Sequence, residues 1–247
     1  IARLLQMALT LAFIFYSKQL RPTGFQIWRI RAQRVKTMLG VGIPTSFQIF
    51  AESGAFAILA IFAGMISAKA QAAHQICQIM GSMSFMLPLG FGAAATIRIG
   101  YAVGRNDPLA IKRVMRMSYL AVIVCMSAYA LFVIALRQTI PHWFTQDAEV
   151  IQIAAVCLFW GALMALSDGT QSVGICMLRG LRDVKVSSIV AAILYWGVGL
   201  PASWIFAFTL NKGAPGLWMG LFLVLTLVSI FAFLRLQSNI RRRIKVL

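Results

Sequence analysis

Two carboxylates stand inside apolar stretches that are long enough to cross a bilayer. Glu52 lies near the centre of the stretch 41–64, and Asp168 lies within the stretch 151–177. An ionised carboxylate in hydrocarbon costs at least a few kcal/mol, so such a residue usually faces a cavity, a partner or a proton. Two acids in one low-dielectric cavity can hold a proton, or can coordinate Na⁺ together with neutral oxygens. Glu52 and Asp168 are therefore the first candidates for a site that binds H⁺ or Na⁺.

Other polar side chains share helical faces with these acids. Gln48 precedes Glu52 by four residues, and Gln171 follows Asp168 by three, so each pair lies on one side of a helix. His74 and Gln78 are four residues apart on a third apolar stretch. The spacing predicts three polar helix faces that could meet in one cavity, although the sequence alone leaves their meeting open.

The composition is that of an integral membrane protein. Hydrophobic residues make up 60% of the chain and charged residues only 12%, whereas about a quarter of the residues of a soluble domain are charged. The net charge of +17 does not indicate a nucleic-acid partner. Binding to nucleic acid would require basic side chains on a solvated face with aromatic residues between them, and here they lie in short segments between apolar stretches. The expected surroundings are a lipid bilayer.

The apolar stretches predict an all-α membrane protein with six complete crossings. The predicted spans are 41–64, 72–97, 114–136, 151–177, 186–210 and 217–236. Residues 1–17 are interpreted as the end of a truncated transmembrane helix, and 18–40 as a basic cytoplasmic linker that ends in an amphipathic helix. Residues 41–236 then form a six-helix lobe, and 237–247 form a basic cytoplasmic tail.

Three prolines fall within or near the predicted spans. Pro44 is compatible with a first helical turn. Pro88 and Pro201 lie inside spans and should kink them, so both are candidate hinges, with a static kink as the alternative.

Basic residues fix an expected orientation. Placing the segment 18–40 on the cytoplasmic side puts most of the 23 lysines and arginines there. This distribution predicts a cytoplasmic C-terminus, since Lys and Arg concentrate on cytoplasmic loops.

Enzyme and metal chemistry have little support in the sequence. The four cysteines all lie in apolar segments, where they are interpreted as packing residues. His74 and His142 lack carboxylates at metal-ligand spacing, and the common catalytic motifs are missing. We therefore expect neither an enzyme nor a cofactor other than the Na⁺ or H⁺ bound at the two acids.

Several sequence elements together resemble a known family. They are GIPTSFQIFAES, AAHQICQIMGSMSFMLPLGFGAAATIRIGYAVGR, SDGTQSVGICMLRGLRD, GLPASWIFAF and GAPGLWMG. In this order they resemble the C-terminal half of multidrug and toxic compound extrusion (MATE) transporters, in particular the NorM-like bacterial branch. The resemblance implies twelve helices in two lobes around a cavity that opens alternately to each side of the bacterial inner membrane.

This resemblance also implies a function for the two acids. The chain would be the second lobe, with the N-terminal lobe of the same protein as its partner, and would export cationic, often aromatic drugs against entry of Na⁺ or H⁺. The acids of the family site fall on Glu52 and Asp168, with Gln48, His74, Gln78 and Gln171 as candidate supporting groups in the cavity. Met164 stands where NorM-like members carry a tyrosine, which leaves the choice between Na⁺ and H⁺ open.

Three alternatives compete with antiport. A flippase for lipids or lipid-linked saccharides should have a strongly cationic cavity for anionic headgroups. An intramembrane aspartyl protease would need two carboxylates about 3 Å apart as a shared-proton dyad. In a purely structural membrane subunit, Glu52 and Asp168 would be expendable.

Overall fold

The computed structural model describes residues 2–16 and 32–245, and all regular structure in these ranges is helical. The chain divides into two compact units, Ile1–Gly40 and Val41–Leu247, which are described separately. The first contains α1 (Ala2–Tyr16) and the beginning of α2. The remaining elements are α2 (Ala32–Ile66), α3 (Ala68–Gly104), α4 (Pro108–Leu136), η2 (Ile140–Trp143), α5 (Ala148–Gly180), α6 (Val184–Leu194), η3 (Tyr195–Gly199), α7 (Leu200–Trp204), η4 (Ile205–Thr209) and α8 (Gly213–Lys245).

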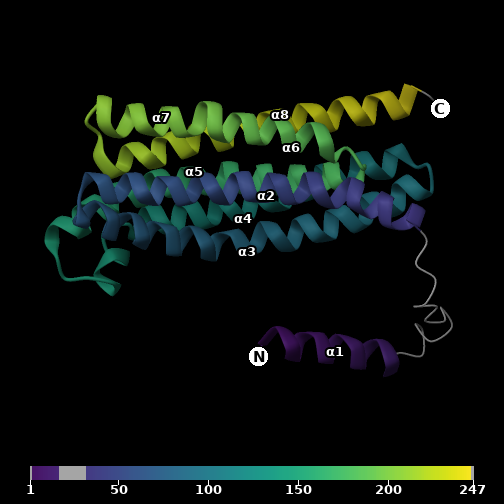
Figure 1. The fold of residues 1–247 in the computed structure, drawn as a ribbon, viewed down its shortest axis with the longest axis horizontal. Helices are drawn as coiled ribbons and strands as arrows, with labels where there is room; N and C mark the ends of the chain where they lie inside the picture. Colours follow the sequence, from purple (N-terminus) through teal and green to yellow (C-terminus); the bar gives the residue numbers. More distant parts are fainter. Residues whose placement is uncertain (1, 17–31, 246–247) are drawn as a thin grey trace. The chain divides into compact units, whose positions relative to one another are not determined.

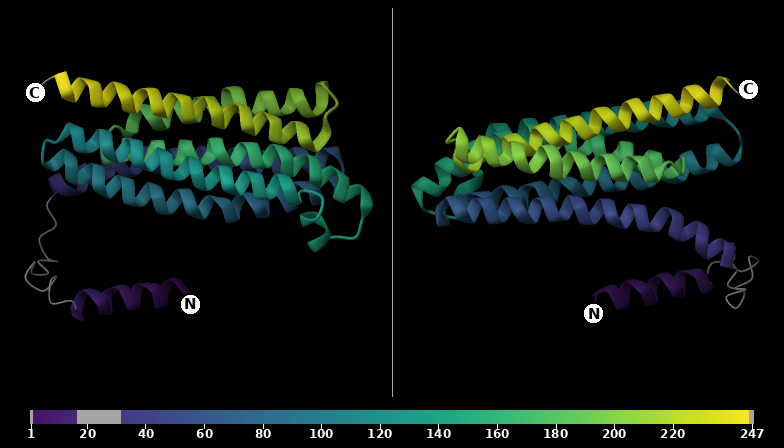
Figure 2. Two further views of the ribbon diagram at one scale, coloured as in Figure 1. Left: turned by 180° about the vertical axis from the view of Figure 1, so that it is seen from behind. Right: turned by 45° about the horizontal axis from the view of Figure 1, so that its top comes forward.

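The unit Val41–Leu247 is an up-and-down bundle of long helices (Figure 1). Six helical segments in the described residues are long and apolar enough to cross a membrane, and α6, η3, α7 and η4 together form one of them. Figure 2 shows from two further sides that these helices run nearly parallel or antiparallel to one another. The predicted six-helix membrane bundle is confirmed.

α5 forms the centre of this bundle. It packs most extensively against α3 and α8. Small residues permit this packing: a Cβ added at Gly180 would lie 2.9 Å from the backbone oxygen of Thr96 on α3. One added at Gly174 would lie 3.1 Å from Cβ of Ala232 on α8. Such small contact residues are typical of helix pairs in membranes, where dispersion contacts replace the hydrophobic effect between helices.

Hydroxyl pairs join α5 to α8. The side-chain oxygens of Ser167 and Thr226 are 2.8 Å apart, and those of Thr170 and Ser229 are also 2.8 Å apart. Both α5 hydroxyls lie on a helix whose backbone groups are otherwise paired. These bonds therefore help to fix the position of α5 along α8, in addition to apolar packing.

An acidic side chain links the turn between α5 and α6 to α8. Asp183 accepts hydrogen bonds from Arg235 Nε at 2.7 Å and from Asn239 Nδ2 at 2.6 Å. Burial raises the pKa of Asp183, but these two hydrogen bonds and the charges of Arg235 and Arg242 lower it more, so its pKa lies below the ordinary value of 3.8. The carboxylate is therefore ionised and paired across most of the pH range.

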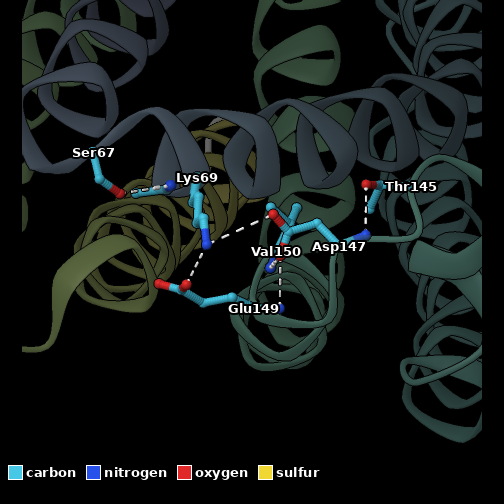
Figure 3. A network of polar contacts seen from close by, with 7 residues as sticks. Ser67, Lys69, Thr145, Asp147, Glu149 and Val150 are labelled. Atoms are coloured by element: carbon cyan, nitrogen blue, oxygen red, sulfur yellow. Dashed lines mark hydrogen bonds and ion pairs between the residues drawn. The ribbon is translucent and has the colours of Figure 1, made fainter.

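Another ion-pair cluster lies at the opposite ends of the helices. Lys69 on α3 contacts Glu149 and, at 3.7 Å, Asp147 (Figure 3). Asp147 also caps α5, and the backbone N–H groups of Val150 and Glu149 hold the pKa of this carboxyl below its usual value. All three charged side chains are substantially exposed.

The structure corrects the place of Pro44 and adds detail to two predicted segments. α2 begins at Ala32, so the helix predicted at the end of the linker continues directly into the span, and Pro44 lies in the helix interior rather than in its first turn. The reason is local: residues 32–39 are mostly good helix formers and contain neither Gly nor Pro. α8 continues to Lys245, so most of the predicted tail is also helical. Residues 17–31 of the predicted linker lie outside the described residues.

The two candidate hinge prolines have different surroundings. α3 continues through Pro88 as one α-helix. Around Pro201 the helix type changes, because the π-helical turns η3 and η4 flank α7. A proline removes one backbone donor and its ring crowds the carbonyl four residues earlier, which favours such irregularity.

Candidate functional site

A cavity of about 610 Å³ lies between α2, α3 and α5. The six predicted polar site residues all line it, so the three polar helix faces do meet. These residues are Gln48, Glu52, His74, Gln78, Asp168 and Gln171. The candidate hinges Pro88 and Pro201 are not among the lining residues.

Glu52 is held by hydrogen bonds but has no cation beside it. Tyr195 donates its hydroxyl hydrogen to Glu52 Oε1 at 3.0 Å, and Gln171 Nε2 lies at 3.5 Å from the same oxygen. Within the described part of the chain, no lysine, arginine or histidine lies within ion-pair distance of Glu52. The carboxylate is therefore oriented by neutral groups, and the charge of Arg179 acts on it only from beyond ion-pair distance.

Asp168 is less satisfied than Glu52. It is 8% exposed and lines the same cavity, and in the described residues its carboxylate has neither a hydrogen bond nor an ion pair. Arg179, about three turns further along α5, also lines the cavity, but its Nε has no hydrogen-bond partner. Two acids without paired cations in one cavity favour an exchangeable cation or proton there.

Neutral polar groups around the cavity also lack partners. His74 is 1% exposed, neither of its ring nitrogens is hydrogen-bonded, and its ring centroid lies 5.4 Å from that of Trp218. The side-chain oxygens of Gln48 and Gln78 are likewise buried without partners. Because buried polar groups are normally hydrogen-bonded, these atoms are suited to a polar ligand or to water inside the cavity.

The donor set restricts which ion fits. No group of three or more His, Cys, Asp or Glu side chains suitable for a metal occurs in the described residues. Two carboxylates with neutral amide oxygens nearby suit a hard monovalent cation or a proton, and do not match the nitrogen and sulfur ligands that transition metals prefer. This donor set is compatible with Na⁺ or H⁺ at Glu52 and Asp168.

Much of the remaining cavity wall is apolar. Aromatic and aliphatic side chains line it, among them Phe56, Phe85, Met86, Met164 and Ile175. Cavities of about 300–1,000 Å³ with apolar walls and a few placed polar groups are typical of sites for drug-sized ligands.

Tyr195 was missed in the sequence. Met164 lines the cavity one turn before Asp168 and offers no hydroxyl, whereas Tyr195 brings a hydroxyl to the site from a different helix, 143 residues from Glu52. The only signal was a tyrosine in the middle of a span close to two glycines and Pro201. Arg179 was missed as well, because it follows the predicted span 151–177, whereas α5 continues to Gly180.

The fold and the cavity define a multi-pass helical membrane protein with a polar, ligand-sized site inside one bundle. The family model MatE matches residues 44–205, and the chain belongs to the MatE family. The "Probable multidrug resistance protein NorM" of Bradyrhizobium diazoefficiens is 36% identical over 78% of this chain and 42% of the relative. That of Xanthomonas campestris is 34% identical over 86% of this chain and 46% of the relative.

A solved structure shares the fold. The crystal structure of MATE in the straight conformation superposes with a TM-score of 0.86 at 18% identity, and covers 98% of this chain and 55% of that one. The chain thus spans about half the length of the relatives it matches.

Proposed function

We propose that this chain is the C-terminal lobe of a twelve-helix multidrug efflux transporter. It would export cationic, largely aromatic drugs by antiport with Na⁺ or H⁺. The observation that carries this proposal is the pair Glu52 and Asp168, which lack cation partners in a cavity with apolar walls. Similarity to NorM proteins over about half of their length supports the assignment to one lobe.

Antiport follows if one site binds two kinds of cation in turn. A coupling cation or proton that neutralises Glu52 and Asp168 removes the attraction for an organic cation, so the two occupants disfavour each other. Gln48, Gln78 and Gln171 supply neutral polar groups, and the aromatic and aliphatic wall contacts the apolar part of a drug. The N-terminal lobe would close the other side of the cavity. Pro88 and Pro201 would be the hinges of this chain's own helices.

The proposed location is the bacterial inner membrane with a cytoplasmic C-terminus. The end of α8 and the turns from α3 to α4 and from α5 to α6 lie at one end of the bundle (Figure 1). Basic residues gather there, which is the arrangement of cytoplasmic ends. They include Arg105, Lys112, Arg113, Arg116, Arg179, Arg182, Lys185, Arg235, Arg241 and Arg242.

Gradient-driven efflux tests the proposal. The full-length protein is reconstituted into liposomes loaded with a cationic dye, and an imposed Na⁺ gradient is compared with an imposed pH gradient. One gradient should drive efflux in the wild type and fail to drive it in Glu52→Gln and Asp168→Asn, whereas Asp183→Asn serves as the matched control. Normal efflux in both cavity variants would refute the mechanism and leave the flippase and structural alternatives.

A further inference from the structure

Two side chains from one turn bind α2 at the level of Glu52. Elsewhere α2 packs through buried residues of the core, among them Ala55 and Leu59. Tyr195 donates to Glu52 at 3.0 Å, and Trp196 Nε1 donates to the backbone carbonyl oxygen of Ala51, also at 3.0 Å. Two successive residues of η3 therefore bind two successive residues of α2.

The close contact between η3 and α2 depends on a glycine and an irregular helix. A Cβ added at Gly54 would lie 3.2 Å from the ring of Trp196, so the indole reaches α2 closely because this position has no side chain. η3 is a π-helical turn in which Leu200 N–H bonds to the Tyr195 carbonyl, just before Pro201. Single π turns of this kind often occur at functional sites.

The hydroxyl of Tyr195 has two acceptors and one proton. Its oxygen lies 3.0 Å from Glu52 Oε1 and 3.0 Å from Gln171 Oε1. A phenolic O–H donates to one acceptor at a time, and an ionised carboxylate is roughly twice as strong an acceptor as a neutral amide. Tyr195 is only 1% exposed, so water does not compete for the proton. The charge on Glu52 therefore decides which acceptor is used.

We propose that Tyr195 is a positioning residue that links the occupancy of Glu52 to the attachment of α2. Its hydroxyl donates to Glu52 while the carboxylate is empty and charged, and to Gln171 once a bound cation neutralises the carboxylate. α2 then keeps the bond from Trp196 but loses the bond from Tyr195. This inference rests on the proposed function, since it requires a cation at Glu52.

Other charged and titratable groups also face this position. They come from α3, α5 and η3 in the described residues, and are His74, Asp168, Cys176, Arg179 and Tyr195. The test is therefore designed so that it changes neither pH nor the ion present.

A double-mutant cycle read by amide hydrogen exchange tests the link. The full-length protein in nanodiscs, without drug, is compared with Tyr195→Phe, Glu52→Gln and the double variant, and exchange is followed in residues 49–57 of α2. Tyr195→Phe should raise exchange about tenfold, as expected for loss of a hydrogen bond to a charged group. Glu52→Gln should raise it severalfold by weakening the same bond, and the double variant should exchange no faster than Tyr195→Phe alone.

Trp196→Phe is the matched control. It removes the neighbouring hydrogen bond from the same turn, and its effect should add to that of Glu52→Gln because the two bonds are independent. Unchanged exchange in Tyr195→Phe, unchanged exchange in Glu52→Gln, or additive effects of these two substitutions would each overturn the link. The proposed function is judged separately, by dye efflux of Glu52→Gln, so the two failures are distinguishable.

Discussion

The cavity acids and Asp183 show two ways in which a membrane protein accommodates a carboxylate. Asp183, at the end of the bundle, is paired with Arg235 and Asn239. Glu52 receives bonds only from neutral groups, and Asp168 has no partner in the described residues. The protein itself pairs Asp183 with a cation, whereas the cavity acids are available to an exchangeable cation or proton.

From this difference we expect Asp183 to act in stability and the two cavity acids to act in the proposed transport. Removing one member of a partly buried ion pair leaves the other charge uncompensated, so Asp183 should contribute to stability. Neutralising an unpaired buried acid removes an unfavourable charge, so Glu52 and Asp168 should contribute to function at a cost in stability.

The largest expected effect comes from neutralising the cavity acids. Glu52→Gln or Asp168→Asn should abolish gradient-driven dye efflux by the full-length protein, while its melting temperature stays the same or rises. Efflux in proteoliposomes and a thermal melt of the purified protein measure the two quantities. A large drop in melting temperature in either variant would show that these acids stabilise the fold as Asp183 does, and would contradict the proposed difference between them.

Asp183→Asn should show the opposite pattern. It breaks a hydrogen-bonded ion pair and should lower the free energy of unfolding by about 1–3 kcal/mol, with efflux per folded molecule retained. Arg235→Gln is the reciprocal variant, and the double variant should lose less than the sum of the two. Loss of efflux in well-folded Asp183→Asn protein would show that this end of the bundle takes part in transport.

The Asp183 contribution should depend on pH in a defined direction. Since its folded pKa is lowered, the stabilisation is complete above the ordinary value of 3.8 and is lost as pH falls through the lower folded value. The difference in melting temperature between the wild type and Asp183→Asn should be constant from about pH 7 to pH 5, and should shrink below about pH 4. A difference that already shrinks near neutral pH would contradict the assigned pairing.

The hydroxyl pairs between α5 and α8 should have a smaller effect. Thr170→Val should lower stability by about 0.6 kcal/mol, the average for a hydrogen bond between membrane helices. A double-mutant cycle with Ser229→Ala on thermal stability measures the coupling. Zero coupling would mean that the two hydroxyls are satisfied separately by their own helix backbones.

The smallest effect is expected at the exposed cluster around Lys69. Lys69→Ala should leave the melting temperature unchanged within error at physiological salt, because exposed ion pairs are screened and cost side-chain entropy. The same measurement at low salt should reveal a small decrease. A clear loss at physiological salt would show that exposed pairing matters here as much as pairing at Asp183.

The sequence predicted much of the fold and most of the site. Long apolar stretches gave the six spans, and spacings of three and four residues placed Gln48, His74, Gln78 and Gln171 on the same faces as the residues they accompany in the cavity. The prediction for Pro44 was wrong, because hydropathy reports where a helix becomes apolar and not where it begins.

The sequence by itself identified two acids inside apolar, membrane-spanning segments. They are recognisable because the cost of burying a charge follows from residue type and hydropathy alone. Only the tertiary structure decided their partners. Tyr195 lies 143 residues from Glu52, and Arg235 lies 52 residues from Asp183. Such pairings depend on how distant helices are rotated and staggered when they pack, and helical periodicity, which is local, carries no information about a neighbour's rotation.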